Sequence, residues 1–362
     1  MNAGNIRGGV ETYLETLART PGRFEAEFAV CFEGPFLERL RRSGRPVHVL
    51  GPVRARRPWS IWRARARLRR VLAEGRHEVV VGHGPWPHAL AAPAARASGA
   101  KAVLFAHGPP GGTWVDRWAR WSRPDAVLAN SRHTERAMRE ELPGVACSVV
   151  HPAVPAPTPA ARSARDRLRA ELGAAPDEVV LVCVGRLDPC KGHRVLVEAL
   201  RRLPGSLRWR AWIVGGAQTP SEVGLERWLR EAAGSNGLAG RLRLLGLRDD
   251  VPALLAAADL YCQPNVTPDS FGISLVEALD AGLPVLTSAL GGALEVIDPS
   301  CGVLLPPRDA TGLAAHLERL IGDPSLRRSL GAAGPARARS LCDPAGQVEQ
   351  LERALSPLVR AR

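Results

Sequence analysis

The stretch LYCQPNVTPDSFGISLVEALDAGLPVLTS, residues 260–288, decides the fold class of this chain. Its two ends, 260–265 and 283–288, are apolar runs with the length of buried strands, and residues 270–281 between them have helical periodicity. A strand, a helix and a second strand in this order predict a parallel sheet of Rossmann-like type. Ligands of such sheets bind at the carboxyl ends of the strands, so we expect a site in the loop that follows residue 265.

The same alternation continues along the whole chain. The apolar runs that predict buried strands are 27–32, 78–84, 101–108, 126–131, 178–187, 209–216, 242–246, 260–265 and 283–288. Helical patterns such as 190–203 and 221–234 lie between them. The Pro- and Ala-rich segment 152–165 has no core periodicity and predicts a linker between two Rossmann-like domains. The last helix, roughly 344–359, is amphipathic, and we expect it to pack on the N-terminal domain.

The beginning of the chain departs from this pattern. Almost nothing apolar precedes Gly8 and Gly9, so we expect the first strand to be absent or the true start to lie upstream. The two glycines precede the helical segment TYLETLAR, where they allow a ligand to approach the backbone closely.

Composition excludes several classes of protein. The 362 residues are 45% hydrophobic, which suits buried cores and excludes a disordered chain. No apolar run is long enough for a membrane span, and the N-terminus does not resemble a signal peptide, so we expect a cytoplasmic protein. The 7 cysteines form no C-x-x-C pair and cannot all pair, which predicts buried reduced thiols and no zinc site.

The net charge of +13 is concentrated in the first half of the chain. Residues 1–150 carry 24 Lys and Arg against 13 Asp and Glu, whereas the remainder carries 25 against 23. An anionic partner would explain this: a phosphorylated acceptor, an acidic membrane face or nucleic acid. The alternative is that arginines simply cover a solvated surface. Because no nucleic-acid recognition motif is present, we expect no nucleic-acid partner.

Tryptophans lie in two helical segments of this basic half. Residues 54–76 combine arginines with apolar residues, including Trp59 and Trp62, at near-helical spacing. We interpret this as ordinary packing on a sheet, and contact with an anionic bilayer is the alternative. The spacing of Trp114, Trp118 and Trp121 predicts core residues.

The strongest chemical signal runs from Asp269 to Glu277. Asp269 lies in the loop before the predicted helix, and Glu277 lies about two turns inside it. A helix N-terminus offers N–H groups to an anion, so the amides of Phe271, Gly272, Ile273 and Ser274 are candidates to hold a phosphate. Glu277 would accept hydrogen bonds from hydroxyl groups. The alternative is a pair of solvated or capping carboxylates.

A second signal, GRLDPCKG at 185–192, follows the predicted strand 178–187. Arg186 and Lys191 leave the carboxyl end of this sheet and would clamp a diphosphate, with Gly185 at the turn. Lys101 is the only other lysine in the chain. The alternative is a surface turn with two solvated cations. No metal-binding D-x-D element is evident, and Asp249-Asp250 is predicted to cap a helix.

Together these segments resemble glycosyltransferase family 4, and the resemblance covers nearly the whole chain. It is carried by GGVETYL, ANSRHTERAM, VVHPAVP, VGRLDPCKGHRVLVEAL, DDVPALLAAADLYCQPN and PDSFGISLVEALDAGLPVLTSALGGALEVI. It implies an α/β GT-B fold with two Rossmann-like domains facing across a cleft. The implied domains are 1–155, which binds the acceptor, 156–342, which binds the nucleotide-sugar donor, and a C-terminal helix in 343–362.

The resemblance also implies residue roles. Arg186 and Lys191 would bind the donor diphosphate, Glu277 the ribose hydroxyls, and Asp269 the transferred sugar. Leu247 takes the position that grips the base through its backbone. His107 matches a histidine near the sugar, and Gly8 and Gly9 match a donor loop.

The activity implied is retaining transfer from a UDP- or GDP-type sugar, without cofactor or metal, to a glycan or lipid-linked acceptor in polysaccharide biosynthesis. The protein would be cytoplasmic, with peripheral contact at the inner face of an anionic membrane. Asp269 replaces the family's longer Glu, so a catalytically impaired binding or scaffold relative is the alternative function.

Overall fold

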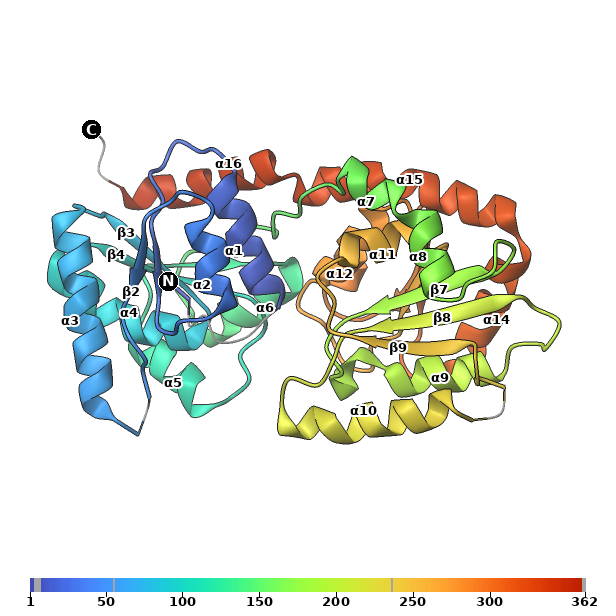
Figure 1. Ribbon diagram of the computed structural model, residues 1–362. Coiled ribbons are helices and arrows are strands. Elements are labelled where there is room, and N and C mark those ends of the chain that lie inside the picture. The colour runs from blue at the N-terminus through green and yellow to red at the C-terminus, as the bar shows by residue number, and fades with distance from the viewer. Residues whose placement is uncertain (3–7, 55, 236, 360–362) are drawn as a thin grey trace. The chain divides into compact units, whose positions relative to one another are not determined.

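The computed structural model describes residues 1–2, 8–54, 56–235 and 237–359. Its contacts divide the chain into two units: Met1–Pro155 with Cys342–Arg362, and Ala156–Leu341 (Figure 1). The sequence analysis places the corresponding borders at 155/156 and 342/343. Each unit is built on parallel strands with intervening helices, so the α/β prediction is confirmed.

Unit 1 contains a two-stranded sheet, β1-β2, and a four-stranded sheet, β3-β4-β5-β6. Its elements are α1 (Gly9–Arg19), β1 (Phe28–Val30), α2 (Pro35–Arg41), β2 (Val47–Val49), α3 (Pro58–Glu74), β3 (Val79–His83), α4 (Pro85–Ser98), β4 (Lys101–Ala106), α5 (Trp114–Trp121), β5 (Ala126–Ala129), α6 (Arg132–Glu141), β6 (Cys147–Val149), α16 (Pro344–Leu355) and η2 (Ser356–Leu358).

Alternate residues of the unit 1 strands face different helices, as the strand period of two requires. Val103 and Phe105 belong to a core with residues of α1, α2 and α16. Ala102, one position earlier, faces the core formed by α3 and α4. The four-stranded sheet is therefore covered on both faces.

Among the described residues no strand precedes α1, in line with the expected absence of a first strand, but the first two residues still bond to strands. Asn2 forms a parallel bridge with Val30, and its N–H donates to the Ala29 carbonyl at 3.1 Å. The terminal ammonium of Met1 donates to the Val81 carbonyl at 2.6 Å. Met1 and Asn2 thus lie between β1 and β3 and connect the two sheets. Residues 3–7, including Arg7 of the predicted glycine loop, lie outside the described residues.

Helix α16 packs on unit 1, the position that its amphipathic pattern predicts. Gln350 donates to the Val149 carbonyl at 2.9 Å, and Glu352 accepts from the Phe24 amide at 3.0 Å and from the Arg23 amide. The helix therefore belongs to a unit whose other residues lie nearly two hundred positions earlier.

Unit 2 contains one sheet with the order β12-β11-β10-β7-β8-β9, all parallel. Its elements are α7 (Pro159–Ser163), α8 (Arg165–Glu171), β7 (Val179–Val184), η1 (Pro189–Lys191), α9 (His193–Arg201), β8 (Trp209–Val214), α10 (Pro220–Ala233), β9 (Leu242–Gly246), α11 (Val251–Ala257), β10 (Leu260–Gln263), α12 (Ile273–Asp280), β11 (Val285–Ser288), α13 (Ala293–Val296), β12 (Gly302–Leu305), α14 (Ala310–Gly322) and α15 (Pro324–Cys342).

Helices cover both faces of this sheet. Figure 1 shows α9 and α10 on one face and α8, α11 and α12 on the other. The core on the α9 face contains the fully buried Trp209 together with Leu181 and Leu229. This double covering is why the strands read as nearly continuous apolar runs in the sequence.

The predicted linker 152–165 is only partly irregular, and its second half is helical. Thr158 accepts a hydrogen bond from the Ala161 amide and Pro159 takes the first helical position, a combination that favours a helix start. Arg165 then opens α8 and donates to Asp259 at 2.6 Å. The compositional bias towards Pro and Ala therefore marks a helix cap as well as a connection.

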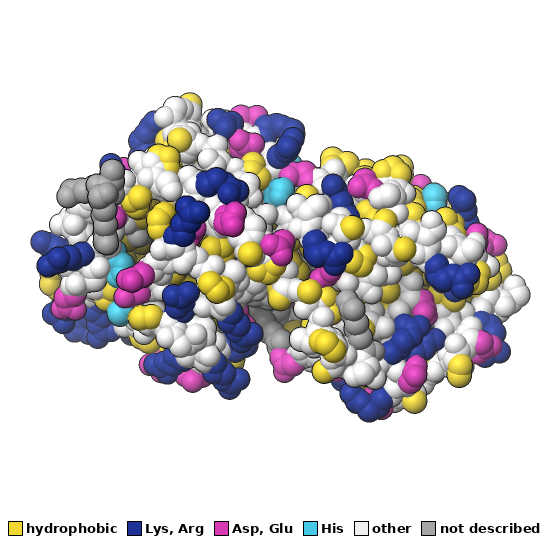
Figure 2. Space-filling model, turned by 90° about the horizontal axis from the view of Figure 1, so that it is seen from above, with side chains coloured by type: hydrophobic (Ala, Val, Ile, Leu, Met, Phe, Trp, Pro, Cys, Tyr) yellow, Lys and Arg dark blue, Asp and Glu magenta, His cyan; other side chains and the backbone are white. Residues whose placement is uncertain are grey.

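The cysteine side chains lie where the sequence predicts, inside the protein, and charged side chains of both signs lie on its surface. All 7 cysteines are unpaired, and every one except Cys190 is buried, as predicted. On the face drawn in Figure 2, Lys and Arg side chains lie over both units and are interspersed with Asp and Glu. Among the described helices, none has the length and apolar character needed to cross a bilayer.

Candidate active site

The two chemical motifs of unit 2 follow adjacent strands at the centre of its sheet. Strand β7 pairs with β8 on one side and with β10 on the other, and Tyr261 of β10 lies opposite Val182 of β7. The chain builds the β8-β9 side first and then returns to build the β10-β11-β12 side. The order therefore reverses between β7 and β10, which is the point where open parallel sheets bind ligands at their carboxyl ends.

At this reversal point the structure brings Lys191 and Asp269 together. The Nζ atom of Lys191 lies 2.5 Å from Oδ2 of Asp269, although the residues are 78 positions apart in sequence. About a fifth of each side chain is exposed (22% and 20%), so the pair faces solvent at the edge of the sheet. A cation and a carboxylate predicted from separate motifs thus form one group.

Glycines allow the loops that carry this pair to lie so close. Gly192 has φ +71°, and a Cβ atom at this position would lie 1.7 Å from the Pro264 carbonyl oxygen. Gly291 and Gly292, after β11, contact the 269–271 loop in the same way, and the Gly292 amide donates to the Asp269 carbonyl at 2.8 Å. No residue with a side chain fits at Gly192 without moving one of the loops.

Arg186, which follows β7, is held in place by two carboxylates. Its guanidinium lies 3.1 Å from Asp188 and 3.4 Å from the carboxylate of Glu222, which is only 4% exposed. Burial raises the pKa of Asp188, but the Cys190 amide and the charges of Arg186 and Lys191 outweigh this, so the pKa is lowered overall. Asp188 therefore stays ionised and helps to orient Arg186.

The N-terminus of α12 follows the Asp269 loop and adds backbone N–H groups to the site. Gly272 adopts the left-handed conformation (φ +94°) and precedes Ile273, the first helical residue. The first N–H groups of a helix have no acceptor within it, so those at Ile273 and Ser274 are available to an anion. Phe271 is 1% exposed, so its side chain belongs to the core and only its backbone borders the loop.

Glu277 lies inside α12 and is half-buried. Its backbone carbonyl accepts from the Ala281 amide, but its carboxyl group forms no hydrogen bond or ion pair with any residue that the structure describes. Burial raises the pKa of its carboxyl group to about 7, so the group holds its proton over part of the neutral range. A half-buried carboxyl without a partner is suited to bind hydroxyl groups of a ligand.

Two further predicted residues border the same edge. Leu247 follows β9 and is 56% exposed, which leaves its backbone accessible. Gly185 follows β7, and its amide donates to the Val214 carbonyl at 2.9 Å. Asp250 occupies the N-cap position of α11, where Asp249-Asp250 was predicted to open a helix, but its carboxylate pairs with Arg248 at 2.7 and 2.6 Å and makes no bond to the helix amides.

In unit 1 the predicted residues are Gly8 and Gly9 at the start of α1 and His107 at the end of β4. Gly8 is extended and Gly9 begins α1. His107 follows β4, and its ring lies 6.0 Å from that of Tyr13 in α1. Burial lowers the pKa of His107 to about 3, so its imidazole is neutral.

His107 has a partner that sequence reasoning missed. Its Nε2 atom lies 3.0 Å from Nδ1 of His83, which ends the neighbouring strand β3. Burial also lowers the pKa of His83, so one neutral ring donates and the other accepts. The available signal was that EVVVGH and KAVLFAH place a histidine at the carboxyl end of each of two successive parallel strands.

The two family models that match divide the chain between them. The description "Glycosyltransferase Family 4" fits residues 7–156, and "Glycosyl transferases group 1" fits residues 164–337. A GDP-mannose-dependent alpha-(1-6)-phosphatidylinositol monomannoside mannosyltransferase of Mycolicibacterium smegmatis is 30% identical over 357 residues, which cover 91% of this chain and 89% of that protein. This chain belongs to glycosyltransferase family 4.

Other relatives of this family 4 chain match more locally or by fold. A D-inositol 3-phosphate glycosyltransferase of Nocardia farcinica is 37% identical over 183 residues, 48% of this chain. The chain spans about two fifths of that relative's length (40%). The structure of Anabaena Alr3699/HepE in complex with UDP-glucose has a TM-score of 0.84 at 25% identity and covers 98% of this chain and 97% of its own. The GT-B fold is confirmed; the cleft between its domains stays a prediction.

The residue that connects the two chemical motifs is Tyr261, which lies in the family 4 segment DDVPALLAAADLYCQPN without a spacing that indicates this role. Tyr261 is fully buried, and its hydroxyl lies 3.1 Å from the Val184 carbonyl and 2.9 Å from Oγ of Ser274. The same hydroxyl lies at donor distance, 2.9 Å, from the amide oxygen Oε1 of Gln263. Tyr261 therefore joins the end of β7 to the first turn of α12, the two elements from whose ends the loops of Lys191 and Asp269 extend.

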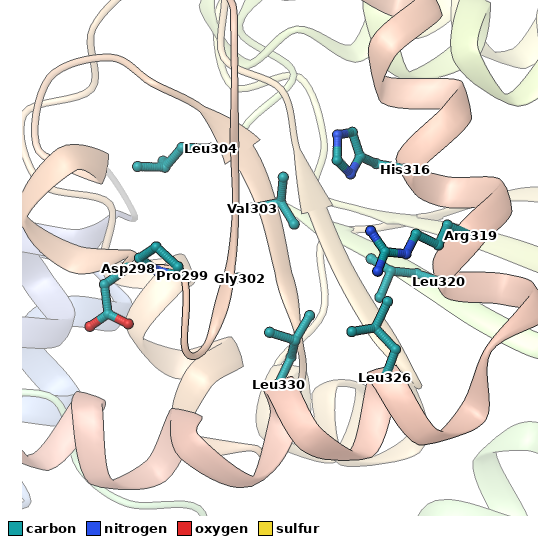
Figure 3. A pocket seen from close by; sticks show the side chains of 10 residues that line it. All are labelled: Asp298, Pro299, Gly302, Val303, Leu304, His316, Arg319, Leu320, Leu326 and Leu330. Atoms are coloured by element: carbon teal, nitrogen blue, oxygen red, sulfur yellow. The ribbon is translucent and has the colours of Figure 1, made fainter.

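One pocket includes a predicted site residue: His107 lines a space of about 180 Å³ in unit 1, together with Gly84, Ala106 and residues of α5 and α6. A second pocket of about 410 Å³ opens beside the edge strand β12, and Figure 3 shows the side chains that line it, which are mostly apolar and include Asp298, His316 and Arg319. None of the predicted site residues lines it. Within the described ranges, no three His, Cys, Asp or Glu side chains are grouped so that they could hold a metal ion.

Proposed function

We propose that this chain transfers a sugar from a nucleotide-diphosphate donor to an acceptor, with the donor bound to unit 2. The observation that supports this most is the meeting of Lys191 and Asp269 at the reversal point of the sheet. Arg186 and the α12 N-terminus add a second cation and free amides at the same edge. Two cations and a helix N-terminus suit a diphosphate, and two carboxyl groups suit the hydroxyls of a sugar and a ribose.

The proposed reaction breaks the bond between the anomeric carbon and the diphosphate oxygen. A bond from that carbon to an acceptor oxygen forms, and the acceptor hydroxyl loses its proton. The proton released by the acceptor hydroxyl is taken up by the departing nucleoside diphosphate, which balances the step. Negative charge that develops on the diphosphate is stabilised by Arg186, Lys191 and the amides of α12. Because these groups can act as the counter-charge, we propose transfer without a metal, and from the resemblance we propose retention of configuration.

We further propose a lipid-linked or glycan precursor as the acceptor. The Mycolicibacterium smegmatis relative acts, by its name, on a phosphatidylinositol monomannoside. The excess of positive charge in residues 1–150 suits a phosphorylated headgroup. A role in polysaccharide biosynthesis at the inner face of the membrane, in the cytoplasm, is consistent with such an acceptor.

A nucleotide screen tests the donor site directly. Thermal shift and titration with UDP, GDP, ADP, dTDP and their sugar conjugates, with and without Mg²⁺, should give a selective stabilisation that needs no metal. Lys191→Ala should abolish it, whereas Lys101→Ala removes the other lysine, which forms a surface pair with Asp125, and should leave it unchanged. If no nucleotide shifts a folded sample, the donor site is not as proposed.

Asp269 favours one alternative, a relative that binds donors but transfers poorly. Its carboxylate is shorter than the family's Glu and is already paired with Lys191. This alternative is correct if the protein binds a sugar nucleotide but releases no nucleoside diphosphate with any acceptor that is offered. Gain of transfer in Asp269→Glu would then identify the missing methylene as the cause.

A further inference from the structure

Four tryptophans of unit 1 are exposed, in contrast to the core position that the sequence spacing predicts for those of α5. Trp59 and Trp62 of α3 are 57% and 72% exposed, and Trp114 and Trp121 of α5 are 52% and 77% exposed. Among the described residues, only Val223, Leu247 and Leu294 are other large apolar side chains with such exposure, and they lie in unit 2. Large exposed aromatic groups gathered on one unit indicate a binding surface.

These tryptophans belong to one surface, which we name the tryptophan face (Trp59, Trp62, Trp114 and Trp121). Helix α3 packs on α4, and α4 packs on α5; Figure 1 shows the three helices at one side of unit 1. Trp59 and Trp62 share a face of α3 because they are three residues apart. One turn further, Arg65 lies 5.5 Å over the ring of Trp118 in α5.

Arg65 fixes the two helices to each other. It donates to the Ala89 and Leu90 carbonyls at 3.0 and 3.2 Å, so a single guanidinium ties α3 to α4 and to the α5 ring. On α5, Trp114 stacks on Trp118 at 6.2 Å, and Trp86 of α4 packs edge-on against both. The exposed rings are therefore presented by a packed scaffold rather than by loose side chains.

Arginines surround the tryptophan face. Helix α3 carries five arginines and one glutamate, and Arg63, Arg69 and Arg70 are exposed on it. On α5, Arg117 and Arg120 are exposed between Trp114 and Trp121. Exposed tryptophans among arginines match the interface of an anionic bilayer, where the indole enters the headgroup region and the guanidinium binds phosphate.

We propose that the tryptophan face binds the surface of an anionic phospholipid bilayer. A bilayer fits better than a protein groove because the exposed rings on α3 and α5 lie among exposed arginines, and charge complementarity with acidic headgroups is direct. The inference deepens the proposed function, since its link to a lipid-linked acceptor rests on that function. The bilayer contact itself requires no catalytic activity.

Vesicle co-sedimentation tests the contact. The full-length protein should bind vesicles of phosphatidylcholine with phosphatidylglycerol, and binding should fall at least tenfold on pure phosphatidylcholine. A variant with Trp59, Trp62, Trp114 and Trp121 all changed to Ser should lose binding at least tenfold. The matched control changes the exposed Val223 and Leu294 of unit 2 to Ser and should bind as the unmodified protein does.

Two further measurements complete the test. Arg63→Gln, Arg69→Gln and Arg70→Gln together should weaken binding to anionic vesicles and reduce its salt dependence. Nucleotide titration of the tryptophan variant should be unchanged, so that loss of bilayer binding is separated from failure of the donor site. Absence of vesicle binding by the unmodified protein overturns the inference. Equal vesicle binding by the tryptophan variant also overturns it. So does the finding that the unmodified protein uses this face to form a dimer or an RNA complex and does not bind vesicles.

Discussion

Only two tyrosines occur in the chain, both are fully buried, and their hydroxyl groups differ in bonding. The hydroxyl of Tyr261 joins β7 to α12, whereas that of Tyr13 has no hydrogen-bond partner among the described residues. Tyr261→Phe should therefore raise the Kd for the nucleoside diphosphate about 3–10-fold, since each lost bond of this kind costs about 1 kcal/mol. Isothermal titration of both variants measures this. Tyr13→Phe is the control and should bind normally; equal effects would contradict a positioning role for Tyr261.

Glu277 should make stability depend on pH. Its pKa is raised in the folded protein from 4.5 to about 7, so the native state retains a proton that the unfolded chain releases. The free energy of unfolding therefore falls as pH rises from about 4.5 to about 7, by on the order of 1–3 kcal/mol. Urea unfolding at pH 5 and pH 8 should show this loss, and Glu277→Gln should show a smaller one. An unchanged difference in the variant would mean that Glu277 is not the group responsible.

At the scale of elements, the approach of two loops depends on Gly192. Gly192→Ala would need a left-handed alanine and would place its Cβ against the Pro264 carbonyl. We expect destabilisation of at least about 2 kcal/mol and loss of nucleotide binding. Gly224→Ala is the opposite control, because Gly224 lies inside α10 with nothing near its Cβ position. It should stabilise by about 0.5–1 kcal/mol. Chemical denaturation of both variants checks the signs, and a neutral Gly192→Ala would contradict the packing.

The strands that can be predicted from the sequence are those that lie in uninterrupted apolar runs. All nine strands predicted from the sequence are present, because buried parallel strands such as Val179–Val184 read as unbroken apolar runs. Strands β2, β6 and β12 were not predicted, because His48 and Ser148 interrupt the first two apolar runs and two prolines end the third directly after Leu305. Helix α7 was missed because its cap lies within a Pro- and Ala-rich segment.

The site was predictable only where a residue belongs to a motif. Arg186, Lys191, Asp269 and Glu277 lie in ordered motifs at strand ends, so their types and positions pointed to a diphosphate site. Glu222, which holds Arg186, sits in a helix with no distinguishing spacing. Tyr261 lies in the family segment 249–265, but there it reads as one more residue of a buried strand. Their contacts depend on which strands become neighbours, and local sequence does not carry that information.

The whole molecule consists of two units, and one of them is closed by the end of the chain. Glu352 accepts hydrogen bonds from the Arg23 and Phe24 amides, and the carboxylate is nearly buried. Glu352→Ala should destabilise unit 1 by about 1–3 kcal/mol and leave unit 2 unchanged. Glu349→Ala removes only a surface pair with Arg353 and should have almost no effect. Hydrogen exchange of each unit distinguishes them; equal loss of protection in both units would contradict this prediction.

The pairing of Lys191 with Asp269 means that the proposed donor site contains its own counter-ion. A ligand has to replace both halves of the pair: an anion must satisfy the ammonium, and a hydroxyl must satisfy the carboxylate that is released. On the proposed function, the intact donor sugar nucleotide meets both conditions, whereas inorganic phosphate meets only the first. The spent nucleoside diphosphate also meets only the first, so the carboxylate returns to Lys191 and helps to expel the product. The same two residues would thus provide selectivity on entry and turnover on exit.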